Sequence, residues 1–161
     1  MNIETARLVL RPITADDVAA VIGNRRTGSW ADDFPAAGDV VVAKLLGRVG
    51  ITHADARYGH RLIVERSSAQ LIGGIGFFGA PTDGAIELGY GVVPSRRRRG
   101  YATEAAGAMV AAAFTRGDVE VVRAQVDLDN PASVLVLEKI GMTRCADTGA
   151  QATYEIRRAF A

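Results

Sequence analysis

The segment that most constrains the fold is an alanine-rich stretch from Gly100 to Arg116. Its interior, residues 105–114, is apolar on every face of a helix and is long enough for a buried helix. Strand-like runs stand before and after it, at 85–93 and 119–127. A helix between strands has to bury its surface against a sheet, so we predict a mixed α/β protein.

The remaining apolar pattern supplies that sheet. Further strands are predicted over residues 7–11, 60–65, 70–78, 143–145 and 152–157. Turns around Ser67-Ser68 and at 81–84 join the central strands into an antiparallel meander. The predicted fold class is α/β (α+β), with a mixed, mostly antiparallel central sheet flanked by helices.

Capping residues predict three more helices. They are expected from Thr14 to Gly23, from Val40 to Ile51 with Asp39 as the cap, and from Asn130 to Gly141. The residues between the first two helices, 24–38, are polar and interrupted by glycine and proline. We expect a loop or a short irregular helix there.

Composition fits an ordinary globular protein. The chain has 161 residues, of which 48% are hydrophobic, and we expect one domain over 1–161. A net charge of +1 argues against a general nucleic-acid coat, and no apolar run is long enough to span a bilayer. The single Cys145 suits a reducing compartment, and residues 1–4 lack the features of a signal peptide. We therefore expect a cytoplasmic protein with no nucleic-acid or membrane partner.

The segment between the third central strand and the alanine-rich helix is suited to bind an anion. The strand ends at Pro94, four arginines follow at 96–99, and the helix opens near Gly100. Free N–H groups at a helix start bind anions, and the small Gly100 and Ala102 let the backbone approach a bulky one. A pyrophosphate fits better than a carboxylate. The alternative interpretation of the arginines is a solvated turn or a nucleic-acid patch.

The spacing Arg97-x-x-Gly100-x-Ala102 resembles the Q/R-x-x-G-x-G/A signature of the GNAT N-acetyltransferase superfamily. In that family the loop cradles the pyrophosphate of acetyl-CoA, and the preceding strand pairs with the pantetheine arm. The resemblance implies that acetyl-CoA is the co-substrate and that Val92 and Val93 hold its arm. It also implies that the phosphates are held by Arg98, Arg99, Gly100, Tyr101, Ala102 and Thr103.

Two further segments extend the resemblance over nearly the whole chain. Asn130-Pro131-Ala132-Ser133 with residues 137–142 resembles the family's second CoA-contacting segment, so Asn130 and Ser133 are implied to contact CoA. The opening, residues 5–12, resembles the Rim-type branch of ribosomal-protein N-terminal acetyltransferases. The implied fold is GNAT-like, and the implied reaction is direct transfer of an acetyl group to a primary amine in a ternary complex.

Such a transfer requires the amine to lose a proton. With pKa values of about 10.4 for a lysine side chain and about 7.8 for an α-amine, deprotonation at pH 7 costs about 4.6 or 1.1 kcal/mol. Glu87 is the candidate base because it lies on the strand that leads to the pyrophosphate loop, where the family often has a carboxylate or an ordered water. The other interpretation is a surface glutamate, since alternation does not show which face of the strand is wet.

The leaving group, a thiolate, needs only a weak acid because a thiol has a pKa of about 8.5. Many family members have a tyrosine where this chain has Leu137. Ser133, one helical turn earlier, is the candidate replacement, as in some Rim-type members; it is equally placed to bond the Asn130 cap. Three of the four tyrosines are interpreted as core or rim residues: Tyr90, Tyr101 and Tyr154.

One motif match is misleading, and no metal pattern is present. Residues 74–79 fit G-x-G-x-x-G, but Pro81 and Asp83-Gly84 follow, so the helix of a dinucleotide site cannot open there. We predict a glycine-rich strand beside the cofactor cleft. His53 and His60 are isolated in sequence, and metal-ligand spacing is missing, so no metal site is expected.

No motif defines the acceptor amine. A protein N-terminus and a small-molecule amine both fit, and the acceptor site is expected within residues 24–60 and at the C-terminal turn. Asp32 and Asp33 are interpreted as solvated loop acids, with attraction of a cationic amine as the alternative. The alternative function is a CoA-binding sensor without efficient turnover, because the usual tyrosine is missing. Whether the protein forms a homodimer is left open.

Overall fold

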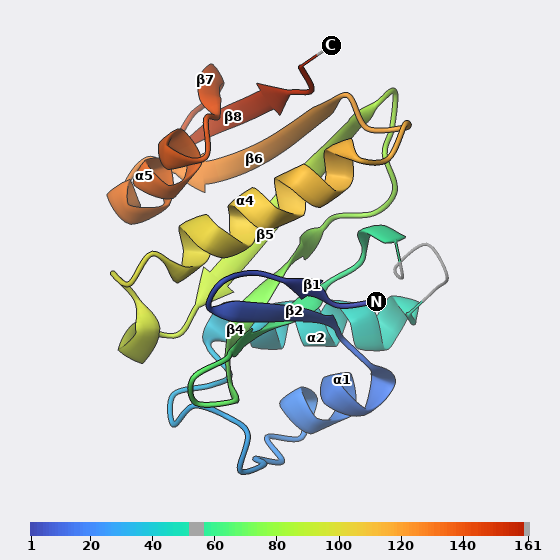
Figure 1. Ribbon diagram of the computed structural model, residues 1–161, viewed down its shortest axis with the longest axis vertical. Coiled ribbons are helices and arrows are strands. Elements are labelled where there is room, and N and C mark those ends of the chain that lie inside the picture. Colours follow the sequence, from blue (N-terminus) through green and yellow to red (C-terminus); the bar gives the residue numbers. More distant parts are fainter. Residues whose placement is uncertain (52–56, 160–161) are drawn as a thin grey trace.

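A computed structural model describes residues 1–51 and 57–159, and its centre is one eight-stranded sheet (Figure 1). The strands follow one another across the sheet in the order β1-β2-β3-β4-β5-β6-β8-β7. Their bounds are β1 Ile3–Glu4, β2 Leu8–Pro12, β3 Arg61–Glu65, β4 Gln70–Phe77, β5 Ala85–Val92, β6 Val121–Asp127, β7 Thr143–Thr148 and β8 Gln151–Arg157.

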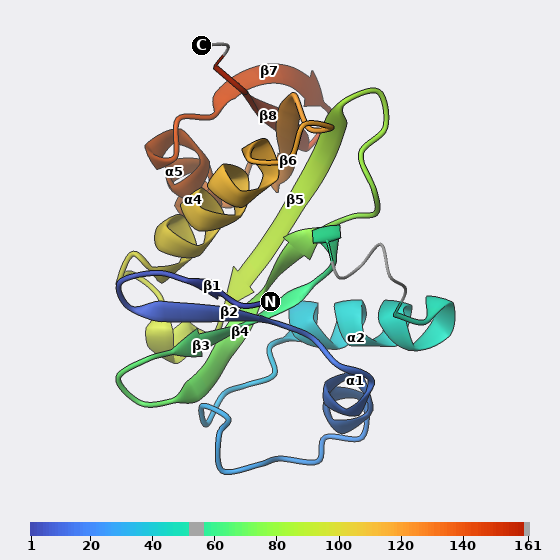
Figure 2. The ribbon, with the colours of Figure 1, turned by 45° about the vertical axis from the view of Figure 1, so that its right-hand side comes forward.

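The helices lie in two groups around this sheet (Figure 2). α1 and α2 lie together beside the half formed by β2 to β4, whereas α4 crosses β5 and α5 follows beyond it. Their bounds are α1 Ala15–Ile22, α2 Ala37–Val49, α4 Tyr101–Phe114 and α5 Pro131–Lys139, with a short 3-10 turn at Pro94–Arg96. The predicted element order and the antiparallel meander are confirmed.

Several predicted boundaries were wrong. β1 was not predicted, β6 starts at Val121 rather than Val119, and β7 continues to Thr148. α2 starts at Ala37 rather than Val40, because Asp39 does not cap it from outside. Asp39 is instead the third residue of the helix. Its Oδ2 atom accepts the Ala36 N–H at 2.9 Å and so closes the first turn. The histidine at position 53 lies outside the described residues.

The alanine-rich helix α4 buries one face rather than its whole circumference. Its buried residues are Tyr101, Ala105, Ala106, Met109, Val110 and Ala113. Ala111, on the other side, is exposed. Alanine tolerates both environments and brings the helix close to the sheet, so an all-apolar composition did not require burial on every side.

Only one neighbouring pair of strands in this sheet is parallel, and that pair is short. β5 and β6 are in register at Ala85–Glu87 with Val121–Arg123 and nowhere beyond. β6 continues along β8 as far as Asp127, while β5 continues along β4 as far as Val92. The two strands therefore separate after Glu87, and the rest of β5 has a strand neighbour on one side only.

Candidate active site

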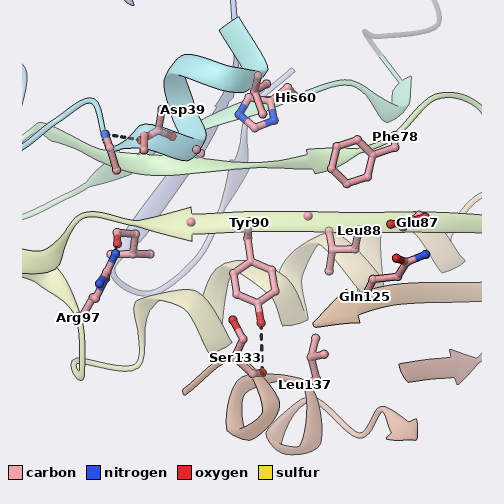
Figure 3. Close-up of a pocket in the computed structure, with 18 of the residues that line it drawn as sticks. Asp39, His60, Phe78, Glu87, Leu88, Tyr90, Arg97, Gln125, Ser133 and Leu137 are labelled. Atoms are coloured by element: carbon pink, nitrogen blue, oxygen red, sulfur yellow. Dashed lines mark hydrogen bonds between the residues drawn. The ribbon is translucent and has the colours of Figure 1, made fainter. Parts of the chain in front are cut away.

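A cavity of about 570 Å³ opens where β5 and β6 separate (Figure 3). One part of its wall is formed by β5 and α5, including Tyr90, Ser133 and Leu137. Another part is formed by the start of α2 and the segment before β3, including Asp39 and His60. The cavity thus joins four segments that are far apart in sequence.

The free edge of β5 carries backbone groups that face the cavity side. In an antiparallel pair, alternate residues exchange hydrogen bonds with the partner strand. The N–H of Phe78 donates to the carbonyl of Glu87, and the N–H of Val93 donates to the carbonyl of Ile72, each at 2.9 Å. The odd-numbered residues of β5 therefore bond β4, and the N–H groups of Tyr90 and Val92 point to the free edge.

This alternation separates Val92 from Val93. Val92 lines the cavity, and by this alternation its N–H lies on the free edge. Its carbonyl accepts a hydrogen bond from the Arg97 Nε at 2.9 Å. Val93 is fully buried, and both its N–H and its carbonyl bond other backbone groups. Because the Val93 N–H already donates to Ile72, only Val92 of the two residues has its N–H on the free edge.

The turn after β5 opens directly into α4. Gly100 is the N-cap, with φ of +79°, and Arg98 also has a positive φ of 60°. The first helical hydrogen bond runs from the Glu104 N–H to the Gly100 carbonyl, so the N–H groups of residues 101–103 have no carbonyl of the helix to bond. A cluster of free amides of this kind favours an anion.

Buried Glu65 on β3 holds this turn in place. Its carboxylate accepts the Tyr101 hydroxyl at 2.6 Å and the Arg96 Nε at 3.2 Å. Arg96 also donates to the Gln70 side chain at 2.9 Å. Tyr101 therefore points inward, as the core interpretation predicted, and only its backbone can meet a ligand.

The four arginines do not act as one basic patch. Arg96 is bonded to Glu65 and Gln70, and Arg97 folds back onto the Val92 carbonyl. Arg98 and Arg99 have exposed side chains beside the free amides of α4. Ala102 and Thr103 lie half-exposed on the first turn. This arrangement fits an anion at the helix start better than a nucleic-acid surface.

Glu87 lies at the point where β5 and β6 separate. It is half-buried, lines the cavity, and is in register with Arg123 of β6. Within the described part of the chain, its carboxylate has no hydrogen bond or ion pair. A carboxylate in that position is accessible to a proton donor in the cavity.

The start of α5 faces Glu87 across the cavity. The Asn130 side chain accepts the Ser133 N–H at 3.2 Å, so Asn130 caps the helix as predicted and does not line the cavity. The Ser133 hydroxyl lines the cavity with no hydrogen bond among the described residues. Leu137 is buried beneath it.

A tyrosine does reach α5, but from β5. The Tyr90 hydroxyl donates to the Ser133 carbonyl at 3.3 Å, and burial raises the pKa of Tyr90 (Figure 3). Tyr90 was predicted to be a core or rim residue, and its contact with α5 was missed. Tyr154, by contrast, is a core residue as predicted.

Asp39 and His60 lie next to each other in the cavity wall, which was not predicted. Both line the cavity next to Gly74 of β4, where a Cβ atom would lie 2.4 Å from His60 Nε2 and 2.9 Å from Asp39 Oδ1. Burial raises the pKa of Asp39 to about 6 and lowers the pKa of His60 to about 4. A glycine within a strand marks close approach of another group, and this was the available signal.

The loop acids behave differently from Asp39. Asp33 accepts the N–H and the hydroxyl of Ser95 at 2.8 and 2.7 Å, so it ties its loop to the turn after β5. Asp32 is exposed.

Across residues 1–51 and 57–159, no group of three or more His, Cys, Asp and Glu side chains could hold a metal ion. No helix in the same ranges is long and apolar enough to cross a membrane.

Comparison with known proteins agrees with this geometry. Residues 7–143 match the family described as Acetyltransferase (GNAT) domain. The chain belongs to the GNAT acetyltransferase family. The glycine-rich run 74–79 is accordingly strand β4 of a GNAT fold and its continuation, not a dinucleotide loop.

Individual GNAT relatives extend the comparison. The chain is 38% identical over 81 residues to the uncharacterized N-acetyltransferase YjdG of Bacillus subtilis (strain 168), an alignment that covers 50% of the chain and only 48% of YjdG. It is 28% identical over 146 residues to the uncharacterized N-acetyltransferase YoaA of the same organism, covering 88% of the chain and 82% of YoaA. RimL, a ribosomal L7/L12 alpha-N-protein acetyltransferase solved in complex with coenzyme A, is 19% identical with a TM-score of 0.70 over 98% of both chains. At that identity the likeness to RimL shows the shared fold.

Proposed function

We propose that this protein transfers the acetyl group of acetyl-CoA to a primary amine, by direct attack of the amine in a ternary complex. The observation that carries the proposal is the free edge of β5, which leads from Glu87 to the free amides at Gly100. One strand edge thereby connects a base candidate in the cavity wall with an anion site that lies beyond Arg97.

The residues fit the two ends of the co-substrate. The amides of residues 101–103, with Arg98 and Arg99, would hold the phosphates. The free N–H groups of Tyr90 and Val92 would hold the pantetheine arm, because an extended chain with amide groups can pair with an open strand edge. Asn130 would shape this part of the cleft as the cap of α5.

Glu87 is the proposed proton acceptor. The amine nitrogen attacks the thioester carbonyl carbon, an N–C bond forms and the C–S bond breaks. One amine proton passes to the Glu87 carboxylate, directly or through water. The half-buried position of Glu87 in the cavity wall, where β5 and β6 separate, supports this role.

Ser133 is the proposed donor to the departing thiolate. Its hydroxyl lines the cavity one helical turn before Leu137 and has no partner among the described residues. The Tyr90 hydroxyl, which bonds the Ser133 carbonyl, stands beside it. A thiolate is a good leaving group, so either hydroxyl has only a small rate contribution to make.

The broader setting follows from the same proposal. We propose that residues 1–161 act as one domain in the cytoplasm, with an amine as partner and neither nucleic acid nor membrane. The amine is a peptide N-terminus or a small molecule. A homodimer is compatible with this activity.

The test is an acetyl-CoA turnover screen that measures thiol release with N-terminal peptides, polyamines and aminoglycosides as acceptors. We expect release that depends on one class of amine. Binding of acetyl-CoA by calorimetry without amine-dependent release would support a CoA-binding sensor instead and overturn the transferase proposal.

A further inference from the structure

The cavity contains a second acidic group that the proposed chemistry does not use. Asp39 Oδ2 accepts the Ala36 N–H, whereas Oδ1 has no hydrogen bond among the described residues and lies against Gly74 in the cavity wall. His60 lies against the same glycine and lines the cavity, and its ring nitrogens likewise have no hydrogen-bond partner in the described part of the chain. Two side chains with unused hydrogen-bonding capacity therefore meet at one place (Figure 3).

Glycine at position 74 lets Asp39 and His60 pack directly against β4. A Cβ atom there would lie within 3 Å of both Asp39 Oδ1 and His60 Nε2. The two side chains line the cavity together with the small aliphatic residues Ala36, Ala37 and Val42. This part of the cavity thus suits an apolar stem that ends in a polar group.

The charges of the cavity favour a cation. Its ionisable lining residues are Asp39, His60, Glu87, Tyr90 and Arg97. Two carboxylates face one guanidinium, so the cavity has an excess of negative charge. Burial keeps His60 uncharged at neutral pH, because its pKa is lowered to about 4, and burial destabilises the Asp39 carboxylate, whose pKa is raised to about 6. A bound cation would offset that destabilisation.

The two carboxylates are too far apart to serve one nitrogen. Asp39 lies over Gly74, which is in register with Gly91 of β5. Glu87 is four residues before Gly91, which corresponds to about 13 Å along a strand. One acid is therefore left for a group other than the amine that reacts near Glu87.

We propose that Asp39 and His60 form an acceptor subsite, which binds a second ammonium group on the acceptor. The acceptor is then a diamine or polyamine, or another amine with a second cation on an alkyl stem. This inference rests on the proposed acetyl transfer and adds the substrate class. Asp39 is a positioning residue: it anchors one end of the acceptor while Glu87 serves the other.

The experiment compares 1,6-diaminohexane with 6-amino-1-hexanol, which has the same length but lacks the second charge. With the wild-type chain, we expect KM for the diamine to be about tenfold lower, because a charge-assisted hydrogen bond is added. Asp39→Asn should bring the ratio of the two KM values to about one, without changing KM for acetyl-CoA. Asparagine retains an oxygen for the Ala36 N–H, so the helix start is conserved.

Two further variants separate recognition from folding. Gly74→Ala keeps the Asp39 carboxylate but places a Cβ atom within 3 Å of Asp39 Oδ1 and His60 Nε2, which displaces both side chains, so it should also remove the preference for the diamine. Asp32→Asn removes an exposed acid from the neighbouring loop and should leave the ratio unchanged. Equal KM values for diamine and amino alcohol in the wild-type chain, or a preference that survives Asp39→Asn, would overturn the subsite.

A binding measurement tests the subsite even without turnover. In the presence of CoA, 1,6-diaminohexane should shift the ring signals of His60 in an NMR titration, and 6-amino-1-hexanol should not. The chain has two histidines, so His60→Gln assigns the signals. Turnover of the amino alcohol with no diamine preference and no shift would leave the transferase proposal standing and refute the subsite. A shift without any turnover would support the subsite and refute the transferase proposal.

Discussion

At the Gly100 turn, the groups proposed to meet a ligand are backbone amides, whereas at Asp39 they are a carboxylate and an imidazole. The amides are held by side chains that point away from the ligand: Tyr101 and Arg96 both bond Glu65. Among the described residues, the Asp39 side chain has one hydrogen bond, from the Ala36 N–H, and the His60 side chain has none. A backbone site depends on geometry that many sequences can provide, while a side-chain site changes with single substitutions. We therefore expect the first region to be common to relatives and the second to define the acceptor.

Gly100→Glu should have the largest effect, because it attacks the backbone site directly. The φ of +79° strains any side chain, the new Cβ would lie 3.3 Å from Arg7 Nη2, and a negative charge enters an anion site. We expect acetyl-CoA affinity to fall by about a hundredfold or more in calorimetry. Gly117→Glu, at an exposed glycine with open space around it, is the matched control. Wild-type affinity in the Gly100 variant would show that the phosphates bind elsewhere.

Glu87→Gln should separate chemistry from binding. We expect turnover to fall by about a hundredfold, since general-base catalysis contributes on this scale, while acetyl-CoA affinity stays nearly constant. The loss should be greatest at low pH, where more of the amine is protonated. Glu138→Gln, an exposed glutamate on α5, is the control. An unchanged pH–rate profile would assign proton transfer to water or to another group.

Ser133→Ala should have a smaller effect, of about tenfold or less in turnover, because a thiolate leaves with little help. Tyr90→Phe removes the other hydroxyl and its 3.3 Å bond to the Ser133 carbonyl. If Ser133 is the donor, Tyr90→Phe should lower turnover less than Ser133→Ala does. A kinetically silent Ser133→Ala with an intact fold would leave Ser133 as part of the helix start and transfer the role to Tyr90.

Tyr101→Phe should have the smallest effect on activity. Its main effect should be to lower the free energy of unfolding. Burial alone would raise the pKa of Glu65, but hydrogen bonds from Ser68, Tyr101 and Arg96 lower it. A lowered pKa stabilises the fold above the usual glutamate pKa of about 4.3, and this stabilisation is lost as pH falls. We expect Tyr101→Phe to reduce the free energy of unfolding by about 1–2 kcal/mol at pH 7 and by less at pH 3 to 4, measured by denaturant unfolding. An equal loss at both pH values would contradict the role of the Glu65 charge.

The backbone region could be predicted from sequence because its determinants are local. The strand, the arginine turn, Gly100 and the alanine-rich helix are contiguous, and each leaves a pattern that one short window contains. Asn130 and Pro131 similarly mark the start of α5. Alternation along a strand allows two registers, and only the bonds to β4 show that the N–H of Val92, and not that of Val93, lies on the free edge.

The side-chain region could not be predicted because its residues meet through the fold. Asp39 lies on α2 and His60 lies just before β3, and His60 looks isolated in sequence. Tyr90 reaches the Ser133 carbonyl across a gap between two strands that diverge. Patterns of period two or 3.6 describe single elements and contain no information on such contacts. The glycines of β4 were the one local sign that another group packs on that strand.

The short parallel pairing of β5 with β6 has a mechanical consequence. Three positions of register join the five strands on one side of the sheet to the three on the other. A pantetheine arm bound to the free edge of β5 would add hydrogen bonds next to this short pairing of β5 with β6. We expect the two halves of the sheet, which are joined by three paired positions, then to unfold as one cooperative unit. The backbone amide hydrogens of Tyr90 and Val92 would also exchange with solvent more slowly. Co-substrate binding in this protein would thus complete the sheet as well as supply the acetyl group.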